Sequence, residues 1–259
     1  MRPTAGRRRG LVALGLLGGL WAPGLAAAEP RPLPDPVPAR GSSACGAAEA
    51  AATSPPAGAL LALAGAEAPG TYADRLATTP LGWPRLEHWC VWVEPVTEAG
   101  PQGRWDRRWG RAVTTALERW RAVLPIERVD DPAAAQVRIL RRRPPLRRGH
   151  GGRMRASHGR ALLRLRTVRR QGIWRDEPQV DVLIGPDQRA LALEATALHE
   201  LGHAFGLWGH SDDPKDAMAV APGASPRTEL SERDRATVLW LYRQPTRFGQ
   251  PRREPERNP

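Results

Sequence analysis

Apolar residues recur with helical spacing in three segments of the chain. In residues 102–124, tryptophan, valine, alanine and leucine return every three or four positions, which predicts a long amphipathic helix whose tryptophans belong to the core. Residues 190–205 and 231–242 predict a second and a third helix. Ser231 can cap the third helix, because Asp234 lies three residues later in its first turn.

Shorter apolar runs predict strands between these helices. They cover residues 89–96, 135–142, 161–168 and 179–185. In the last of them, valine and isoleucine alternate with other residues, as expected of a strand with one buried face. A segment rich in proline, glycine and arginine, residues 143–159, predicts a loop between two of the strands.

Residues 1–28 have the order of a secretory signal peptide. Arginines precede an apolar run at residues 11–20, and three alanines end at Ala28, after which we expect cleavage. An uncleaved anchor is the alternative, although glycines and a proline weaken a membrane-spanning helix here. No later apolar run is long enough to span. We therefore expect the mature protein to be exported, periplasmic or secreted, with no membrane span.

Composition divides the rest of the chain into three parts. Residues 29–80, dominated by alanine and proline, predict a linker and a loosely structured lead-in. The folded body is expected at residues 81–245, followed by a charged, disordered tail at 246–259. In an exported protein, Cys45 and Cys90 can form a disulfide that ties the lead-in to the first strand. Two free thiols are the alternative, because a sequence gives no distance between them.

The chain is strongly basic, but the charge is local. The formal net charge is +12, which on composition alone suggests binding to a polyanion. Thirteen arginines and no acidic residue lie from Arg138 to Arg170, and four more arginines belong to the predicted signal peptide. The remaining residues are mildly acidic, so a polyanion surface is confined to one strand-and-loop region. No specific nucleic-acid motif is visible in the sequence.

Two histidines and a glutamate stand together in the second predicted helix. His199 and His203 are four residues apart, so both imidazoles lie on one helical face and can reach one metal ion, with Glu200 offset to one side. Imidazole nitrogen suits Zn²⁺, and a third protein ligand would leave one position for a water whose pKa the metal lowers. Glu200 can then accept the proton of that water and pass it to a leaving amine. The pattern indicates metal-assisted hydrolysis.

The residues after this helix strengthen that interpretation. Gly206 can end the helix in a left-handed conformation and turn the chain back towards the metal. A further histidine, His210, follows, and Met218 lies eight residues beyond it. Two histidines and a glutamate at this spacing can arise by chance in a chain with six histidines, but the whole series is far less common by accident.

On these residues the chain resembles the metzincin zinc endopeptidases, and among them the matrixin-like branch. His199, Glu200, His203 and Gly206 match the motif of this branch position by position. The resemblance covers residues 81–242 and includes the final helix. The chain is also similar to uncharacterised exported bacterial proteins that are predicted to be zinc-dependent proteases.

The resemblance implies both a fold and a site. The fold is an α+β metzincin-like catalytic domain, a small twisted mixed sheet with a long first helix, an active-site helix and a C-terminal helix. The site is one catalytic Zn²⁺ held by His199, His203 and His210. Glu200 is then the general base, and Met218 supports the metal from below.

One position departs from the family pattern. The third histidine is expected three residues after the glycine, where this chain has Gly209, and His210 comes one residue later. Gly209 has no side chain to offer the metal, but the backbone freedom of glycine can absorb the extra residue. Asp212 or Asp213 is the competing third ligand.

Structural zinc and calcium sites of the branch are not expected here. They use histidines with nearby aspartates in a loop that in this chain holds His150 and His158 among arginines, with no acid. A cation is electrostatically disfavoured there. Together with His88, these histidines are expected to face solvent or to form ordinary hydrogen bonds.

Two functions from different classes fit these patterns. The first is an exported, monomeric zinc endopeptidase that acts on protein or peptide substrates. The alternative is a non-catalytic exported protein that binds polyanions through residues 138–170, with any zinc structural. Both can hold together if the arginines steer acidic substrates to the cleft.

Overall fold

The structure, a computed structural model, describes residues 45–53, 62–97, 99–148, 154–220 and 225–252. These all belong to a unit that spans residues 42–259. The predicted signal peptide and parts of the predicted lead-in and tail lie outside the described residues.

The helices are α1 (Gly103–Arg121), α2 (Ala190–Ala204) and α3 (Glu232–Tyr242), with a 3₁₀ helix η2 (Ala73–Arg75). The strands are β1 (Ala50–Thr53), β2 (Ala62–Leu63), β3 (Ala77–Thr78), β4 (Trp89–Val93), β5 (Ile126–Arg128), β6 (Val137–Leu140), β7 (Arg147–Arg148), β8 (Met154–Arg155), β9 (Gly159–Arg170), β10 (Ile173–Ile184) and β11 (Pro251–Arg252).

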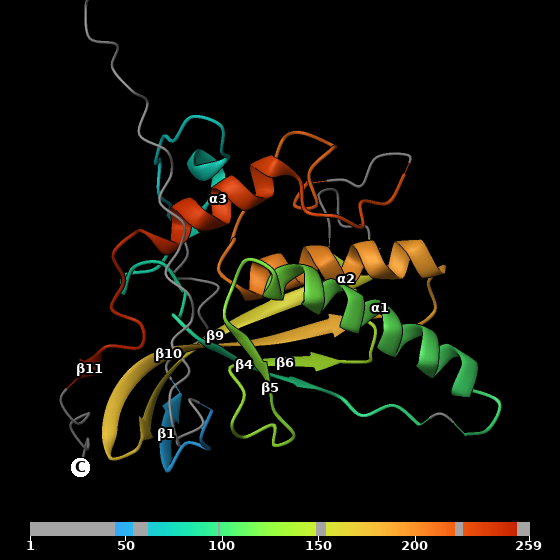
Figure 1. The fold of residues 1–259 in the computed structure, drawn as a ribbon, viewed down its shortest axis with the longest axis horizontal. Helices are drawn as coiled ribbons and strands as arrows, with labels where there is room; N and C mark the ends of the chain where they lie inside the picture. The colour runs from blue at the N-terminus through green and yellow to red at the C-terminus, as the bar shows by residue number, and fades with distance from the viewer. Residues whose placement is uncertain (1–44, 54–61, 98, 149–153, 221–224, 253–259) are drawn as a thin grey trace, which may run out of the picture. The chain divides into compact units, whose positions relative to one another are not determined.

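The centre of the fold is a mixed β-sheet (Figure 1). Its strand order is β1-β9-β10-β6-β4-β5, with β11 paired to β10. The pairs β10–β6, β6–β4 and β4–β5 are parallel, whereas β9 is antiparallel to both of its neighbours. Helices α1 and α2 lie side by side over one face of the sheet. The expected α+β architecture, with a long first helix and two later helices, is confirmed.

The apolar face of α1 packs against the sheet and α2. Trp109 and Trp120 are fully buried, and each indole N–H donates a hydrogen bond to a backbone carbonyl of β10 or α2. Trp105, predicted to belong to the same core face, is only half-buried. It lies in the first turn of the helix, where the guanidinium of Arg108 covers its ring at 4.3 Å from the centroid.

Strands β9 and β10 form a long hairpin that pairs over its whole length. Gln171 (φ 51°) and Gly172 (φ 73°) are both left-handed, as a two-residue type I′ turn requires. The sequence predicted the second strand only over residues 179–185, whereas β10 starts at Ile173 and includes Pro178, a residue that is unfavourable inside a sheet. Proline is tolerated there since β6 pairs with β10 only from Val180 onwards, so Pro178 has a paired neighbour on one side only.

The packed body begins before the expected boundary at residue 81. Tyr72 and Leu76 are fully buried in the core, and β1 pairs with β9. A disulfide joins Cys45 to Cys90, with 5.6 Å between their Cα atoms, and so links the segment before β1 to β4. A short strand joins a sheet through its backbone, which explains why the alanine-rich composition gave no sign of it.

The C-terminal tail, predicted to be disordered over residues 246–259, is ordered at its start. Phe248 is buried, and β11 pairs with β10. The order of this segment depends on one apolar residue and two backbone pairs, and the overall composition of the tail does not reveal so few contacts. In the described parts of the chain, no helix is both long and apolar enough to cross a membrane.

Candidate functional site

Helix α2 ends in a motif that turns the chain back towards its own histidines. The N–H of Leu207 donates to the carbonyl of Gly202, and the N–H of Gly206 donates to the carbonyl of His203, both at 3.0 Å. This pair of hydrogen bonds requires a left-handed residue at Gly206, whose φ is 108°. Glycine adopts that conformation without strain, so the predicted role of Gly206 has a direct geometric basis.

The turn that follows is held from outside by the segment around η2. The N–H of Ala77 donates to the carbonyl of Trp208 at 2.8 Å. Gly209 lies against the backbone of Arg75, and a Cβ added to Gly209 would overlap the Arg75 carbonyl oxygen. The φ of Gly209 is not left-handed. Close approach, rather than the backbone freedom expected from the sequence, therefore requires glycine in this longer turn.

Gly209→Ala is expected to displace the turn that carries His210. Overpacking of this kind costs about 1–3 kcal/mol of unfolding free energy, and the affinity for zinc should fall with it because one ligand moves. Urea unfolding of the zinc-free protein and a competition titration against a chromophoric chelator measure the two effects. Gly110→Ala is the matched control, since its Cβ would meet only Val96 at an ordinary 3.6 Å. Equal zinc affinities in the two variants would contradict the expectation.

Three histidines meet at the end of this turn. One ring nitrogen of each of His199, His203 and His210 lies within 4.8 Å of the other two. The Nδ1–H of His199 donates to the carbonyl of Ala217 at 2.8 Å, and the Nδ1–H of His203 donates to that of Leu207 at 2.7 Å. Because a carbonyl only accepts, both rings carry their proton on Nδ1 and keep an unprotonated Nε2, the tautomer that a metal ligand needs.

Burial favours the neutral form of all three imidazoles. It lowers the pKa of His199 to about 4 and the pKa of His203 well below its usual value, where His199 and His210 add repulsion. Burial also lowers the pKa of His210. Neutral imidazole is the form that binds metal, so the cluster is suited to a cation at neutral pH.

The competing aspartate ligands face away from this cluster. Asp212 forms ion pairs with Arg75 at 3.1 Å and with Arg233 at 2.8 Å. Asp213 accepts a hydrogen bond from the backbone N–H of Lys215 at 2.8 Å. Neither carboxylate joins the three imidazoles, so the geometry favours His210 as the third ligand.

Glu200 is buried beside the cluster, where α2 approaches the first residue of β9. A Cβ added to Gly159 would come within 2.6 Å of the Glu200 Cγ, so a glycine is needed for this approach. Desolvation raises the pKa of Glu200 to about 7, while the N–H of Ala161 and the charge of Arg160 act in the opposite direction. A carboxyl group with such a pKa can both take up and release a proton near neutrality.

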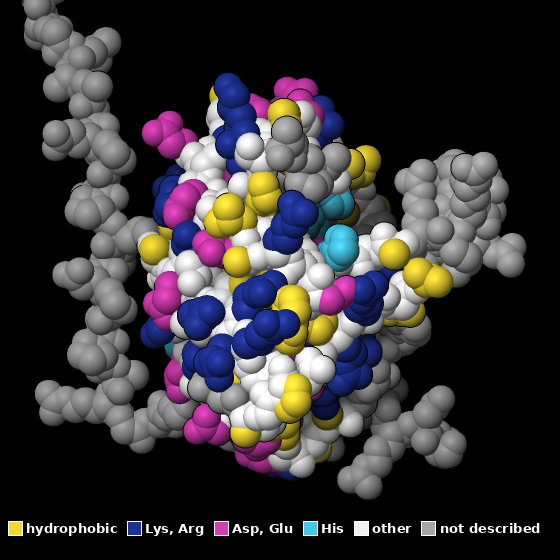
Figure 2. All heavy atoms as spheres, turned by 90° about the vertical axis from the view of Figure 1, so that its right-hand side faces the viewer, with side chains coloured by type: hydrophobic (Ala, Val, Ile, Leu, Met, Phe, Trp, Pro, Cys, Tyr) yellow, Lys and Arg dark blue, Asp and Glu magenta, His cyan; other side chains and the backbone are white. Residues whose placement is uncertain are grey.

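A cavity of about 400 Å³ opens between α2 and the start of β9. His199 and Glu200 line it from α2, and His158 and Gly159 from the opposite side. On this side of the molecule, histidine side chains reach the surface among Lys and Arg side chains (Figure 2). His158, expected to be an ordinary solvent-facing or hydrogen-bonded histidine, therefore stands at the cavity, and no local sequence signal distinguishes it.

Met218 packs against α2 at Gly202, the residue before His203. It is fully buried, and a Cβ added to Gly202 would overlap its sulfur atom and lie 3.0 Å from Trp120. The N–H of Ser211 donates to the Met218 carbonyl at 2.8 Å. The turn that contains Ala217 and Met218, called the methionine turn below, is thereby hydrogen-bonded to the residue that follows His210.

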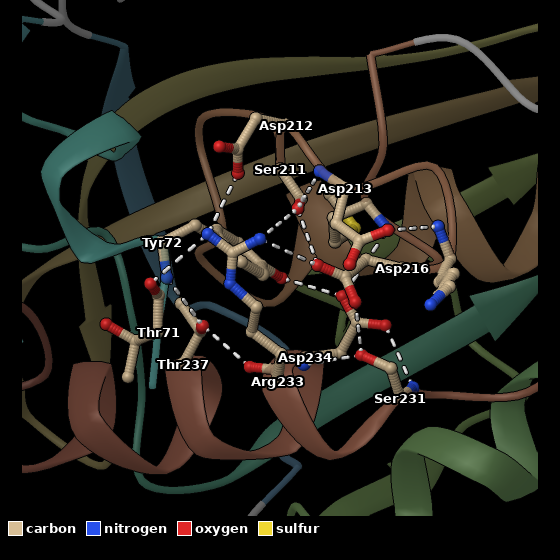
Figure 3. A network of polar contacts seen from close by, with 12 residues as sticks. Thr71, Tyr72, Ser211, Asp212, Asp213, Asp216, Ser231, Arg233, Asp234 and Thr237 are labelled. Carbon is tan, nitrogen blue, oxygen red and sulfur yellow. Dashed lines mark hydrogen bonds and ion pairs between the residues drawn. The ribbon is translucent and has the colours of Figure 1, made fainter. Parts of the chain in front are cut away.

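A buried aspartate on α3 holds this turn in place (Figure 3). Asp234 accepts hydrogen bonds from the backbone N–H groups of Ala217 at 2.8 Å and Met218 at 3.4 Å. It also accepts from the hydroxyl of Tyr72 at 2.9 Å, and it forms a capping box with Ser231. One carboxylate therefore joins the lead-in, the methionine turn and the start of α3.

Asp216 forms a second buried junction in the same network (Figure 3). It accepts from the hydroxyls of Ser211 at 2.5 Å and Ser231 at 2.7 Å, and Arg233 lies 3.4 Å away. The sequence singled out neither Asp216 nor Tyr72 for this site. Tyr72 lies 162 residues from Asp234, and Asp216 lies 15 residues from Ser231, so only the folded arrangement reveals these contacts.

A second group of metal-binding residue types lies at Cys45, His88 and Cys90. Its two sulfur atoms are joined in the disulfide and offer no thiolate, and the Nε2 of His88 lies 3.2 Å from Glu127. In the described part of the chain, the three-histidine cluster is therefore the candidate metal centre.

The model of the matrixin family of peptidases matches residues 102–243, more than half of the chain. The match runs from α1 to the end of α3 and includes the three histidines, Glu200 and Met218. No curated protein matches the chain significantly. The segment that carries Tyr72, Arg75 and Ala77 lies before the matched range, although it contacts the site.

Proposed function

The chain belongs to the matrixin family of zinc-dependent metallopeptidases, and from this we propose that it is an exported endopeptidase in which Glu200 is the general base. The observation that carries the proposal is the three-histidine cluster beside a buried glutamate at a cavity. The family implies protein or peptide substrates.

The donor set fits one zinc ion. Three neutral imidazoles converge, and backbone carbonyls fix the rings of His199 and His203, as in metal sites whose second shell orients the ligands. Three protein ligands leave a position open, as in catalytic rather than structural zinc sites. When bound, zinc polarises a substrate carbonyl and lowers the pKa of a water molecule at the open position.

Glu200 has the position and environment of a proton carrier. It adjoins the cluster, lines the cavity and is buried where a charge is poorly solvated. In the proposed reaction, its carboxylate accepts a proton from the attacking water and donates it to the nitrogen of the leaving amine. Met218 and Asp234 keep the floor of the site in place while this happens.

The outer edge of strand β9 is partly unpaired in the described part of the chain, which favours an extended peptide as the substrate. One edge of β9 pairs with β10 along its whole length. The other edge of β9 pairs with β1, but only from Arg166 to Arg169. Residues 159–165 have no strand partner on that edge among the described residues. An extended peptide can add there through backbone hydrogen bonds and bring its scissile bond past the histidines.

Export is part of the proposal and has two supports. Residues 1–28 have the order of a signal peptide, and the disulfide between Cys45 and Cys90 suits an oxidising compartment. A non-catalytic protein with structural zinc, the alternative from the sequence, is disfavoured by an open three-ligand set at a cavity.

Removal of zinc is expected to abolish peptidase activity reversibly. The purified mature chain should hydrolyse casein, lose that activity in a chelator such as 1,10-phenanthroline, and regain it when zinc is added in excess. Zinc content by elemental analysis should follow the activity at each step. Casein hydrolysis that persists in zinc-free protein would show that the proposal is wrong.

A further inference from the structure

Four arginines crowd the face of the sheet that α1 and α2 leave uncovered. Val180 and Val182 of β10 point into the core, so the residues between them point to the other face. Glu177 and Gln179 share that face with Asp181, because they lie four and two residues before it. Arg138 of β6 lies opposite Asp181, and on β9 Arg164 lies opposite Gln179, Arg166 opposite Glu177 and Arg170 opposite Ile173.

Two carboxylates from β10 compensate only part of this charge. Asp181 pairs with Arg138 at 2.6 Å and with Arg164 at 2.5 Å. Glu177 pairs with Arg170 at 2.9 Å. The cluster therefore keeps a surplus of positive charge.

Of these four arginines, Arg166 is the one whose guanidinium has no hydrogen-bond or ion-pair partner among the described residues. It is nonetheless half-buried. Burial lowers its pKa, and the charges of Arg138 and Arg170 lower it further, while Glu177, opposite Arg166 in the strand register but ion-paired with Arg170, acts in the other direction. A partly desolvated cation among like charges is unfavourable unless an anion binds beside it.

A cavity of about 370 Å³ lies at this guanidinium. Its floor is formed by Arg166, Gln179 and Arg138, which come from the adjacent strands β9, β10 and β6. Its other lining residues are alanines and a proline: Ala48, Ala51, Pro132 and Ala133. No carboxylate lines it. The cavity offers an anion the guanidinium of Arg166, the charge of Arg138, which is paired with Asp181, and the amide of Gln179.

We propose that this cavity is a binding site for a tetrahedral oxyanion, a sulfate or phosphate group, with Arg166 as its principal ligand. Guanidinium groups match such oxygens with paired, charge-assisted hydrogen bonds, and the Gln179 amide can add a neutral donor. Arg166 is seven residues along β9 from Gly159, about 23 Å in an extended strand. The site is therefore separate from the histidine cluster and does not depend on the proposed function.

Calorimetric titration of the zinc-loaded protein with sodium sulfate tests the site, with sodium chloride at matched ionic strength as the reference. Sulfate is preferred to phosphate because it competes less for zinc. The wild type should bind saturably, and Arg166→Gln should weaken binding about ten- to a hundredfold, the effect of one charge-assisted hydrogen bond. Arg166→Lys, which keeps the charge but loses the paired donors, should fall between the two.

Arg169→Gln is the matched control. It removes the same charge three residues further along the same strand, but Arg169 is exposed, pairs with Glu49 and does not line the cavity, so sulfate binding should be unchanged. Equal weakening in both variants, or no saturable binding by the wild type, would overturn the proposal. Titration with a sulfated polysaccharide at the same sulfate concentration identifies the natural form of the bound sulfate group. Tighter binding that still depends on Arg166 indicates a sulfated polymer. Equal affinity indicates the free ion.

Discussion

Glu200→Gln is expected to abolish peptide hydrolysis while leaving zinc bound. Glutamine has nearly the same shape, so it can keep the contact with Gly159 at the start of β9. It cannot accept a proton from water or return one to the leaving amine. General acid–base catalysis contributes about 10²- to 10⁴-fold, and kcat should fall by that factor. Steady-state hydrolysis of a fluorogenic peptide measures the loss, and elemental analysis measures the zinc.

Glu194→Gln is the control for this change. Glu194 lies on the same helix but faces Arg119, with which it pairs at 2.9 Å, and it does not line the cavity. Its replacement should cost some stability and leave kcat close to that of the wild type. If Glu200→Gln keeps full activity, Glu200 is not the base. If it loses its zinc, the carboxylate has a structural role instead.

The helices and the first two candidate metal ligands were predictable because their signals are local. His199 and His203 are four residues apart on one face of a helix, and the capping box of Ser231 and Asp234 spans a single turn. The helical period of the sequence shows such short-range relations directly. Gly206 belongs to the same class, because a helix end is specified within a few residues.

The support of the site was not predictable, because it joins segments far apart in the chain. Tyr72 contacts Asp234 across 162 residues, and Ala77 holds the turn at Trp208. Strands β2 and β3 have two residues each, which is too short for any hydrophobic period to appear. Composition therefore indicated a loose lead-in where the structure has a segment that packs against the candidate site.

The position of His210 after the longer turn follows from the sequence and the structure together. The sequence placed an extra residue there and left the third ligand open between His210 and the following aspartates. The structure adds that Gly209 packs against the Arg75 backbone, which brings His210 to the other two imidazoles. The insertion is thus compensated by a segment that lies before the range matched by the family model.

His210→Ala is accordingly expected to remove zinc and activity together. Structural zinc binding is worth about 10–16 kcal/mol over four ligands, so one ligand accounts for roughly 3–4 kcal/mol. That corresponds to at least about a hundredfold loss of affinity. His210 is the most exposed of the three histidines, so the zinc-free variant should unfold at nearly the same urea concentration as the zinc-free wild type. Competition titration against a chelator of known affinity measures the binding.

Asp213→Ala separates His210 from its competitor. Among the described residues, the Asp213 side chain accepts one hydrogen bond, from the N–H of Lys215 in its own turn, so its loss should cost about 1 kcal/mol of stability, as for a lost cap, and should leave zinc affinity unchanged. The opposite result, with zinc lost in Asp213→Ala and kept in His210→Ala, would mean that the turn rearranges when metal binds. Because the two residues are three positions apart on one turn, this pair of variants tests directly whether the longer turn delivers an imidazole or a carboxylate to the metal.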